Sequence, residues 1–200
     1  MSIFKSMVAV SAIVMASLSA EAQISLGQPA YGGTGCPAGS ASATLTPDGS
    51  VLSVLFDQFY AEAGNTTARR IDRKNCSLRI PVNVANGYQV ALLAFDYRGF
   101  AAVPNGGMAV LDASYSYIGQ PFPVRFSKAF RGGYNSNYSV TNELVSTTLT
   151  WSPCGRQVML EASVSARTTA PSNMQQTMLA VDSVDVQAGI LYSVRFQRCK

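Results

Sequence analysis

The sequence predicts an all-β protein, an antiparallel β-sandwich of about 8–10 strands. Two observations lead to this fold class. Apolar and polar residues alternate with a period of two in many short segments, as in strands with one buried face. Turn-forming sequences rich in Gly, Pro, Asn and Asp separate many of these segments, and no helical period is found after the first 22 residues. A closed β-barrel is the alternative architecture.

Three segments show the strand pattern most clearly. Residues 76–84, 158–166 and 190–196 each place apolar side chains on one face and polar side chains on the other. Pro81 has no backbone N–H, so its strand lies at a sheet edge or its ring faces outward. Asn86-Gly87 predicts a tight hairpin turn, because both residue types tolerate positive φ. Weaker strand patterns cover residues 41–46, 51–60, 88–97, 108–118, 123–130, 144–151 and 177–186.

The N-terminus has the three parts of a secretory signal peptide. Lys5 precedes an apolar run from Met7 to Leu18, and the small-x-small sequence Ala20-Glu21-Ala22 follows. The run is shorter than the roughly 20 residues that span a bilayer, and no later segment is apolar enough to span one. We therefore expect cleavage before Gln23 and a secreted protein, or a periplasmic one in a bacterium. The predicted domains are a signal peptide at 1–22 and a single β-sandwich at 23–200, with an extended lead-in rich in Gly, Ser and Pro at 23–40.

All four cysteines follow the expected cleavage site: Cys36, Cys76, Cys154 and Cys199. An even number in an exported chain predicts two disulfides, and three pairings are possible. We favour Cys36–Cys76 and Cys154–Cys199, which would tie each end of the domain to a nearby strand. A zinc site is the alternative, but zinc sites usually contain close cysteine pairs, and these cysteines are far apart. No metal or other cofactor is expected.

Six sequence motifs occur in an order typical of one known family. They are GTGCPAGS (33–40), VLSVLFDQFYAEAG (51–64), KNCSLRIPV (74–82), DYRGFA (96–101), SYSYIG (114–119) and WSPCG (151–155). From Gly33 onward the chain resembles the secreted proteins of domain-of-unknown-function family 4360 (DUF4360). The resemblance implies a small, exported, disulfide-bonded protein of the kind seen in fungi and bacteria. It implies no activity and provides no catalytic residues.

Composition excludes several function classes. The chain has no histidine, which excludes Ser-His-Asp and Cys-His nucleophile systems. The net charge of +4 is mild and no basic stripe is present, so no nucleic-acid partner is expected. Paired carboxylates, as in glycoside hydrolysis, remain possible. The candidates for such a pair are Asp57, Glu62, Asp96, Asp112, Glu143 and Glu161.

Two charged segments are candidate binding sites. Asp96 and Arg98 share one strand face, so they either form an ion pair, which we favour, or contact a polar ligand beside Tyr97. Arg69, Arg70, Arg73 and Lys74 form a basic run. We favour a solvated loop between strands for this run, and the alternative is a contact with an anion or an acidic glycan.

Aromatic residues are concentrated between residues 115 and 138. We favour core packing for Tyr115, Tyr117, Tyr134 and Tyr138, and the alternative is that they are exposed and form a contact surface for carbohydrate or protein. The polar segment 131–142 is a candidate mobile binding loop.

The favoured function is therefore a secreted, non-enzymatic binding or structural module for a glycan or protein partner. A carbohydrate-active enzyme and a secreted inhibitor or effector are the alternatives.

Overall fold

A computed structural model describes residues 24–119, 123–143, 151–181 and 190–199, which form thirteen strands in two antiparallel sheets. Sheet A consists of β1 (Ile24–Leu26), β2 (Ala30–Gly32), β6 (Ile71–Val84), β8 (Met108–Tyr117), β9 (Val124–Arg131) and β11 (Val158–Thr169). Sheet B consists of β3 (Ala41–Leu45), β4 (Val51–Phe56), β5 (Tyr60–Ala63), β7 (Tyr88–Val103), β10 (Tyr134–Glu143), β12 (Thr177–Ala180) and β13 (Ile190–Arg198). The predicted signal peptide lies outside the described residues.

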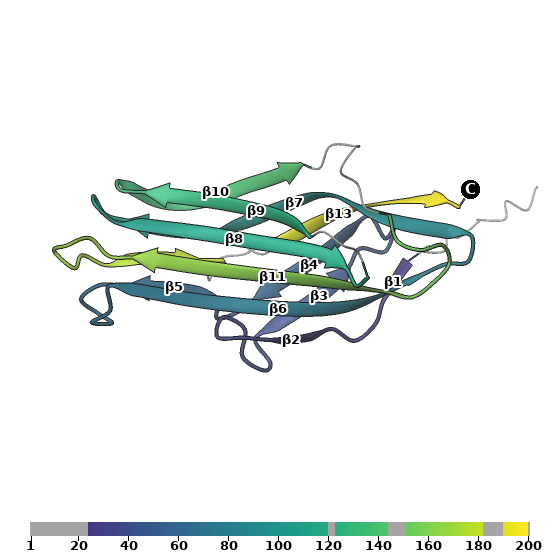
Figure 1. Cartoon of the computed structure of the whole chain (residues 1–200), viewed down its shortest axis with the longest axis horizontal. Helices are drawn as coiled ribbons and strands as arrows, with labels where there is room; N and C mark the ends of the chain where they lie inside the picture. The colour runs from purple at the N-terminus through teal and green to yellow at the C-terminus, as the bar shows by residue number, and fades with distance from the viewer. Residues whose placement is uncertain (1–23, 120–122, 144–150, 182–189, 200) are drawn as a thin grey trace, which may run out of the picture.

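The two sheets stack as an open sandwich, with β6, β8 and β11 of sheet A in front of β3, β4 and β13 of sheet B (Figure 1). In sheet A, β6 is followed by β11, β8 and β9, and the short β1 and β2 pair with the other side of β6. In sheet B, β7 pairs with β10 on one side and with β13 and β12 on the other. The predicted antiparallel sandwich is confirmed, and the described strands do not close into a barrel. Among the described residues, no helix is long and apolar enough to cross a membrane.

The core lies between the sheets and is built from alternate residues of each strand. Even-numbered residues of β11 are buried, including Leu160, which is 1% exposed, as the predicted alternation requires. Aromatic rings join the sheets. Phe95 stacks on Tyr115 with ring centroids 3.3 Å apart, and Tyr97 stacks on Phe126 at 4.6 Å. Each fully buried large apolar side chain stabilises the fold by about 1.5–3 kcal/mol, so these inner faces hold the sheets together.

Pro81 shows why a proline is tolerated inside a long paired strand. The sequence predicted either an edge strand or an outward ring. The ring of Pro81 is on the outer face, and β6 is not a free edge because it pairs with β11. The carbonyl of Pro81 accepts a bond from Gly27 N (2.7 Å), on the side where β1 ends and β2 has not begun. Because the N and C=O of a strand residue point to the same side, the missing N–H faces this gap, and no bond of the β6–β11 ladder is lost.

Both favoured disulfides are confirmed: Cys36–Cys76 and Cys154–Cys199. Cys36 and Cys76 are fully buried and attach the lead-in to β6. Gly33 makes this close approach possible, because a Cβ at this position would collide with the carbonyl of Asn75. The second disulfide joins the segment before β11 to the residue after β13, near the β6–β7 turn, where Cys199 N donates to Gly87 O (2.8 Å).

The structure corrects three local predictions. Segment 131–142, expected to be a mobile loop, mostly forms β10, which pairs with β7 over ten residues. The segment 51–60 is divided, because β4 ends at Phe56 and β5 begins at Tyr60. Asn86-Gly87 does form a turn, with φ +80° at Gly87, but it joins sheet A to sheet B and so does not close a hairpin. Most of the predicted strand at 144–151, and the end of the one at 177–186, lie outside the described residues.

Candidate functional site

Core packing, the favoured interpretation, is confirmed for three of the four candidate tyrosines, so the alternative of an exposed tyrosine surface is wrong for them. Tyr115, Tyr117 and Tyr138 are at most 6% exposed, because their positions on β8 and β10 face the opposite sheet. Burial raises the pKa of Tyr117 and of Tyr138 well above the ordinary tyrosine value. The Tyr138 hydroxyl donates to the carbonyl of Ala180 at 2.9 Å, so it has a partner inside the core. These three tyrosines contribute to core packing.

Tyr134 is half-buried and lies at the start of β10, where the β7–β8 and β9–β10 turns meet the β11–β12 loop. It lines a hollow of about 440 Å³ together with amide side chains such as Asn105 and Gln175. Its hydroxyl donates to the Asn137 carbonyl (3.2 Å), and its ring packs against Phe130 at a centroid distance of 5.1 Å. Tyr134 is therefore a partly exposed residue whose hydroxyl and ring both contact other parts of the protein.

The Asp96-Tyr97-Arg98 segment does not form a site. The Asp96 carboxylate accepts a hydrogen bond from the Thr141 hydroxyl of β10. The ion pairs within the described part of the chain do not include one between Asp96 and Arg98, so that favoured prediction is wrong. Tyr97 is 1% exposed and packs in the core. Gly99, which follows Arg98, pairs in register with Tyr138 and makes no bulge.

The basic run Arg69–Lys74 is divided between a loop and a strand. Arg69 and Arg70 lie in the loop before β6, and Arg69 Nη1 is 3.4 Å from Asp72 Oδ1. Arg73 lies on the outer face of β6, where its Nε donates to Ser165 Oγ at 3.1 Å. The prediction of a loop is therefore wrong for Arg73 and Lys74, which both lie within β6, and Arg73 is on the outer face of sheet A.

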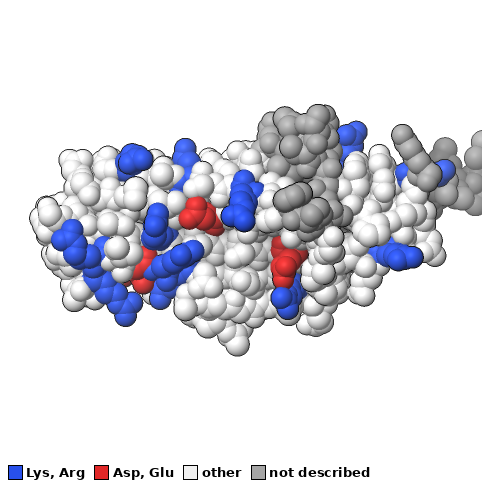
Figure 2. Space-filling model, in the orientation of Figure 1, with Lys and Arg blue, Asp and Glu red and all other residues white. Residues whose placement is uncertain are grey.

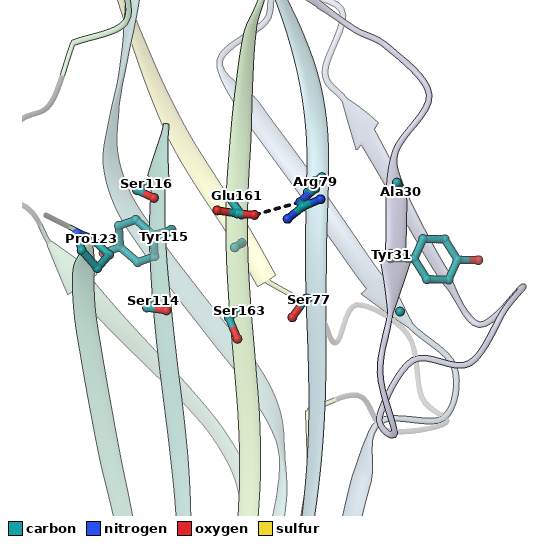
Figure 3. A pocket seen from close by; sticks show the side chains of 12 residues that line it. Ala30, Tyr31, Ser77, Arg79, Ser114, Tyr115, Ser116, Pro123, Glu161 and Ser163 are labelled. Carbon is teal, nitrogen blue, oxygen red and sulfur yellow. Dashed lines mark hydrogen bonds and ion pairs between the residues drawn. The ribbon is translucent and has the colours of Figure 1, made fainter. Parts of the chain in front are cut away.

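The outer face of sheet A carries serines where long polar side chains usually cover a sheet. Ser77, Ser163 and Ser114 are directly opposite one another on the neighbouring strands β6, β11 and β8. Figure 3 shows these three side chains side by side. Ser116 and Ser165 lie on the same face. Ser116 is two residues beyond Ser114 on β8, and Ser165 is two residues beyond Ser163 on β11, in the opposite direction. We call these five residues and their immediate surroundings the serine face.

Small side chains leave the serine face hollowed. The first hollow has a volume of about 520 Å³, and the second, of about 430 Å³, adjoins it because both are lined by Ser114 and Ser163. Arg79 and Glu161 stand in the first hollow, joined by an ion pair of 2.8 Å from Nε to Oε1 (Figure 3). The second hollow is lined by Arg73, Arg125, Asp112, Ser127 and Ser165, among others.

The charges of the two hollows differ. In the first hollow, Arg79 and Glu161 neutralise each other. In the second hollow, Arg73 and Arg125 face a single carboxylate, Asp112, which accepts a hydrogen bond of 2.6 Å from Ser127 Oγ. Lys and Arg side chains outnumber Asp and Glu on this view of the molecule, and many lie over the half that holds the start of β6 (Figure 2).

The carboxylates of this face are poorly placed for glycoside hydrolysis. Glu161 is opposite Ser116, four residues along β8 from Asp112. Four residues at about 3.3 Å each and one strand spacing of about 4.8 Å separate their Cα atoms by roughly 14 Å. Hydrolysis by paired carboxylates needs a separation of about 5–9.5 Å.

The other acidic candidates are spread over different elements. Asp57 is exposed after β4, Glu62 is half-buried on β5, and Asp96 is on β7, whereas the side chain of Glu143 lies outside the description. No three His, Cys, Asp or Glu side chains gather as a metal site within the described ranges.

A secreted β-sandwich stapled by two disulfides, with a hydroxyl-lined outer face, is the class of protein that these features define. Residues 22–199 match the family described as Domain of unknown function (DUF4360), and the chain belongs to this family. A relative from Arthroderma benhamiae, described as an uncharacterized secreted protein, is 33% identical over 169 residues. The match covers 84% of this chain and 69% of the relative. This relative and the two disulfides confirm the predicted secreted class.

Proposed function

We propose that this protein is a secreted, non-enzymatic binding module that holds a glycan on the serine face. The row formed by Ser77, Ser163 and Ser114 is the observation that supports this proposal most strongly. Each serine hydroxyl both donates and accepts hydrogen bonds, as sugar hydroxyls do. Three such groups at strand spacing, about 4.8 Å apart, form a repeated array that suits a chain of sugar rings.

The dimensions of the hollows also favour a glycan. Both lie within the roughly 300–1,000 Å³ of small-molecule sites, and each is an open depression that an extended polymer could enter from either end. A protein partner is less well supported, because interface centres are enriched in exposed aromatic residues, and those that line the hollows, Tyr31, Tyr115 and Phe126, are buried or half-buried against the core. The exposed large apolar residues among those described lie on separate elements: Leu55, Tyr60, Ile71, Ile118 and Phe196.

The proposal is tested by filling the hollows. Ser163 is exposed and lines both of them, so Ser163→Phe obstructs both without a change in the core. Affinity electrophoresis against dextran, β-glucan, mannan, polygalacturonate and dextran sulfate would identify the polysaccharides bound. We expect Ser163→Phe to weaken binding about tenfold or more, equivalent to about 1.4 kcal/mol.

Ser42→Phe is the matched control, because Ser42 is exposed on β3 of the opposite sheet. It should leave the affinity unchanged. Binding to none of these polysaccharides, or an equal loss in both variants, would contradict a glycan site on the serine face.

A further inference from the structure

We infer that the glycan is anionic, and that Arg73 and Arg125 hold its carboxylate or sulfate groups in the second hollow, with Arg167 beside them. This inference rests on the proposed function and names the ligand class that the same face selects. Three features of the second hollow support it: an unfavourable pair of like charges, an excess of positive charge over the nearby acids, and unused hydrogen-bond donors.

The first feature is the pairing of Arg73 with Arg167. These residues are directly opposite each other on β6 and β11, and both are exposed on the outer face. Directly opposite residues of antiparallel strands have Cβ atoms about 4.5–5.5 Å apart, and like charges at such positions destabilise a sheet. An anion between the two guanidinium groups would turn this repulsion into two attractions.

The second feature is that nearby acids do not balance these arginines. In the part of the chain that the structure describes, ion pairs join Arg69 to Asp72 and Arg79 to Glu161, and they include none of Arg73, Arg125 and Arg167. Asp112 is the carboxylate in the lining of the second hollow. Two lining arginines and this single carboxylate leave a positive charge of one, and Arg167 adds another beside the hollow.

The third feature is the supply of donors. Arg73 uses Nε for Ser165 Oγ, which is one of the five N–H groups of a guanidinium. Ser165 Oγ accepts that bond, which leaves its O–H as a donor. Arg125 is exposed on β9, opposite Ser114. Guanidinium groups beside hydroxyls are well suited to carboxylate and sulfate oxygens, which accept charge-assisted hydrogen bonds.

Matched pairs of polymers test the inference directly. Polygalacturonate and its fully methyl-esterified form share a backbone and differ in charge, as do dextran sulfate and dextran. We expect the wild-type protein to bind at least one charged polymer about tenfold more tightly than its neutral partner. We also expect this preference to decline strongly between about 50 mM and about 500 mM NaCl, because salt screens exposed charges.

Single substitutions locate the anion site. Arg73→Gln and Arg125→Gln should each weaken binding of the charged polymer about tenfold and leave the neutral polymer unaffected. Arg195→Gln is the matched control, since Arg195 is an exposed arginine on β13 of sheet B. Arg195→Gln changes the net charge by the same amount, and it should leave the affinity for the charged polymer almost unchanged.

The melting temperature provides a second measurement, because a residue with only a structural role would change it in the opposite direction. Arg167→Gln removes the like-charge pair, so we expect the melting temperature of the unliganded protein to rise by about 1–3 °C at low salt. The same substitution should weaken binding of the charged polymer. A fall in both melting temperature and affinity would indicate an ordinary structural residue and count against the inference.

The failures of the two proposals are distinguishable. Equal binding of charged and neutral polymers, lost in Ser163→Phe, would overturn the anionic ligand and leave the glycan site intact. Binding to none of the polymers would overturn both. Binding to vesicles of phosphatidylserine, with no polysaccharide bound, would replace the glycan with a membrane surface and would also overturn both.

Discussion

Gly99 should be among the positions least tolerant of substitution, because a side chain from the neighbouring strand passes over it. Tyr138 is directly opposite Gly99, and its hydroxyl reaches across β7 to the carbonyl of Ala180 on β12. A Cβ at Gly99 would lie 2.7 Å from that hydroxyl and would collide with the Ala180 carbonyl. In Gly99→Ala, the Tyr138 ring and β12 must therefore both move away from the added methyl group.

Two costs add in this variant. Overpacking a core typically costs about 1–3 kcal/mol, and an unpaired buried carbonyl costs about 1–3 kcal/mol. The better strand propensity of alanine offsets about 0.5–1 kcal/mol. We expect the free energy of unfolding to fall by about 3 kcal/mol, measured as the shift of the urea midpoint by circular dichroism with an unchanged m-value.

Gly32→Ala is the matched control, because a Cβ there has no atom within 4 Å and the backbone is not in the left-handed region. Its free energy of unfolding should stay the same or rise by about 0.5 kcal/mol. Tyr138→Phe should cost about 1–2 kcal/mol, and its combination with Gly99→Ala should cost less than the sum of the single changes. If Gly99→Ala stays within 1 kcal/mol of wild type, the reasoning about this crossing is refuted.

Three further predictions concern stability. Replacing Cys36 and Cys76 by alanine should lower the free energy of unfolding by about 4 kcal/mol or more, because a loop of about 40 residues is no longer closed; a smaller shift on urea unfolding would contradict this. Because the pKa values of Tyr117 and Tyr138 are raised in the fold, their burial stabilises it below the unfolded-state value of 10.0, and that stability is lost as pH rises further. Ultraviolet titration should therefore show at least two tyrosines that ionise only with alkaline unfolding, and full ionisation of the native protein near pH 10 would contradict it. Glu161→Gln should change the free energy of unfolding by less than about 1 kcal/mol, because its ion pair is at the surface, and a larger loss in urea would assign it a structural role.

The sequence predicted the fold class because alternation reports burial directly. Residues 158–166 showed which side of β11 faces water, and the structure confirms that Glu161 and Ser163 lie on that side. The disulfide pairing was also correctly favoured. By contrast, β10 was mistaken for a loop, because its outward residues and the preceding Gly132-Gly133 have loop composition. Pairing with β7 and burial of Tyr138 override those local preferences.

The serine face was not predicted, although its signal is visible in the sequence. Serines alternate in SYSY (114–117) and SVS (163–165), and Ser77 follows Cys76. What brings them together is the strand order β6–β11–β8 and its register, which depend on contacts between segments far apart in the chain. The tyrosines between the serines were more conspicuous, but the same alternation that places Ser114 and Ser116 on the outer face buries Tyr115 and Tyr117.

Amide chemical-shift mapping tests the central claim most directly. The isotope-labelled mature protein would be titrated with oligomers of whichever polysaccharide it binds, and two-dimensional ¹H–¹⁵N spectra recorded. We predict that the largest shifts fall on Ser77, Ser114 and Ser163 and on neighbouring outward residues of β6, β8 and β11. Largest shifts around Tyr134 or on sheet B would place the ligand elsewhere and contradict the account.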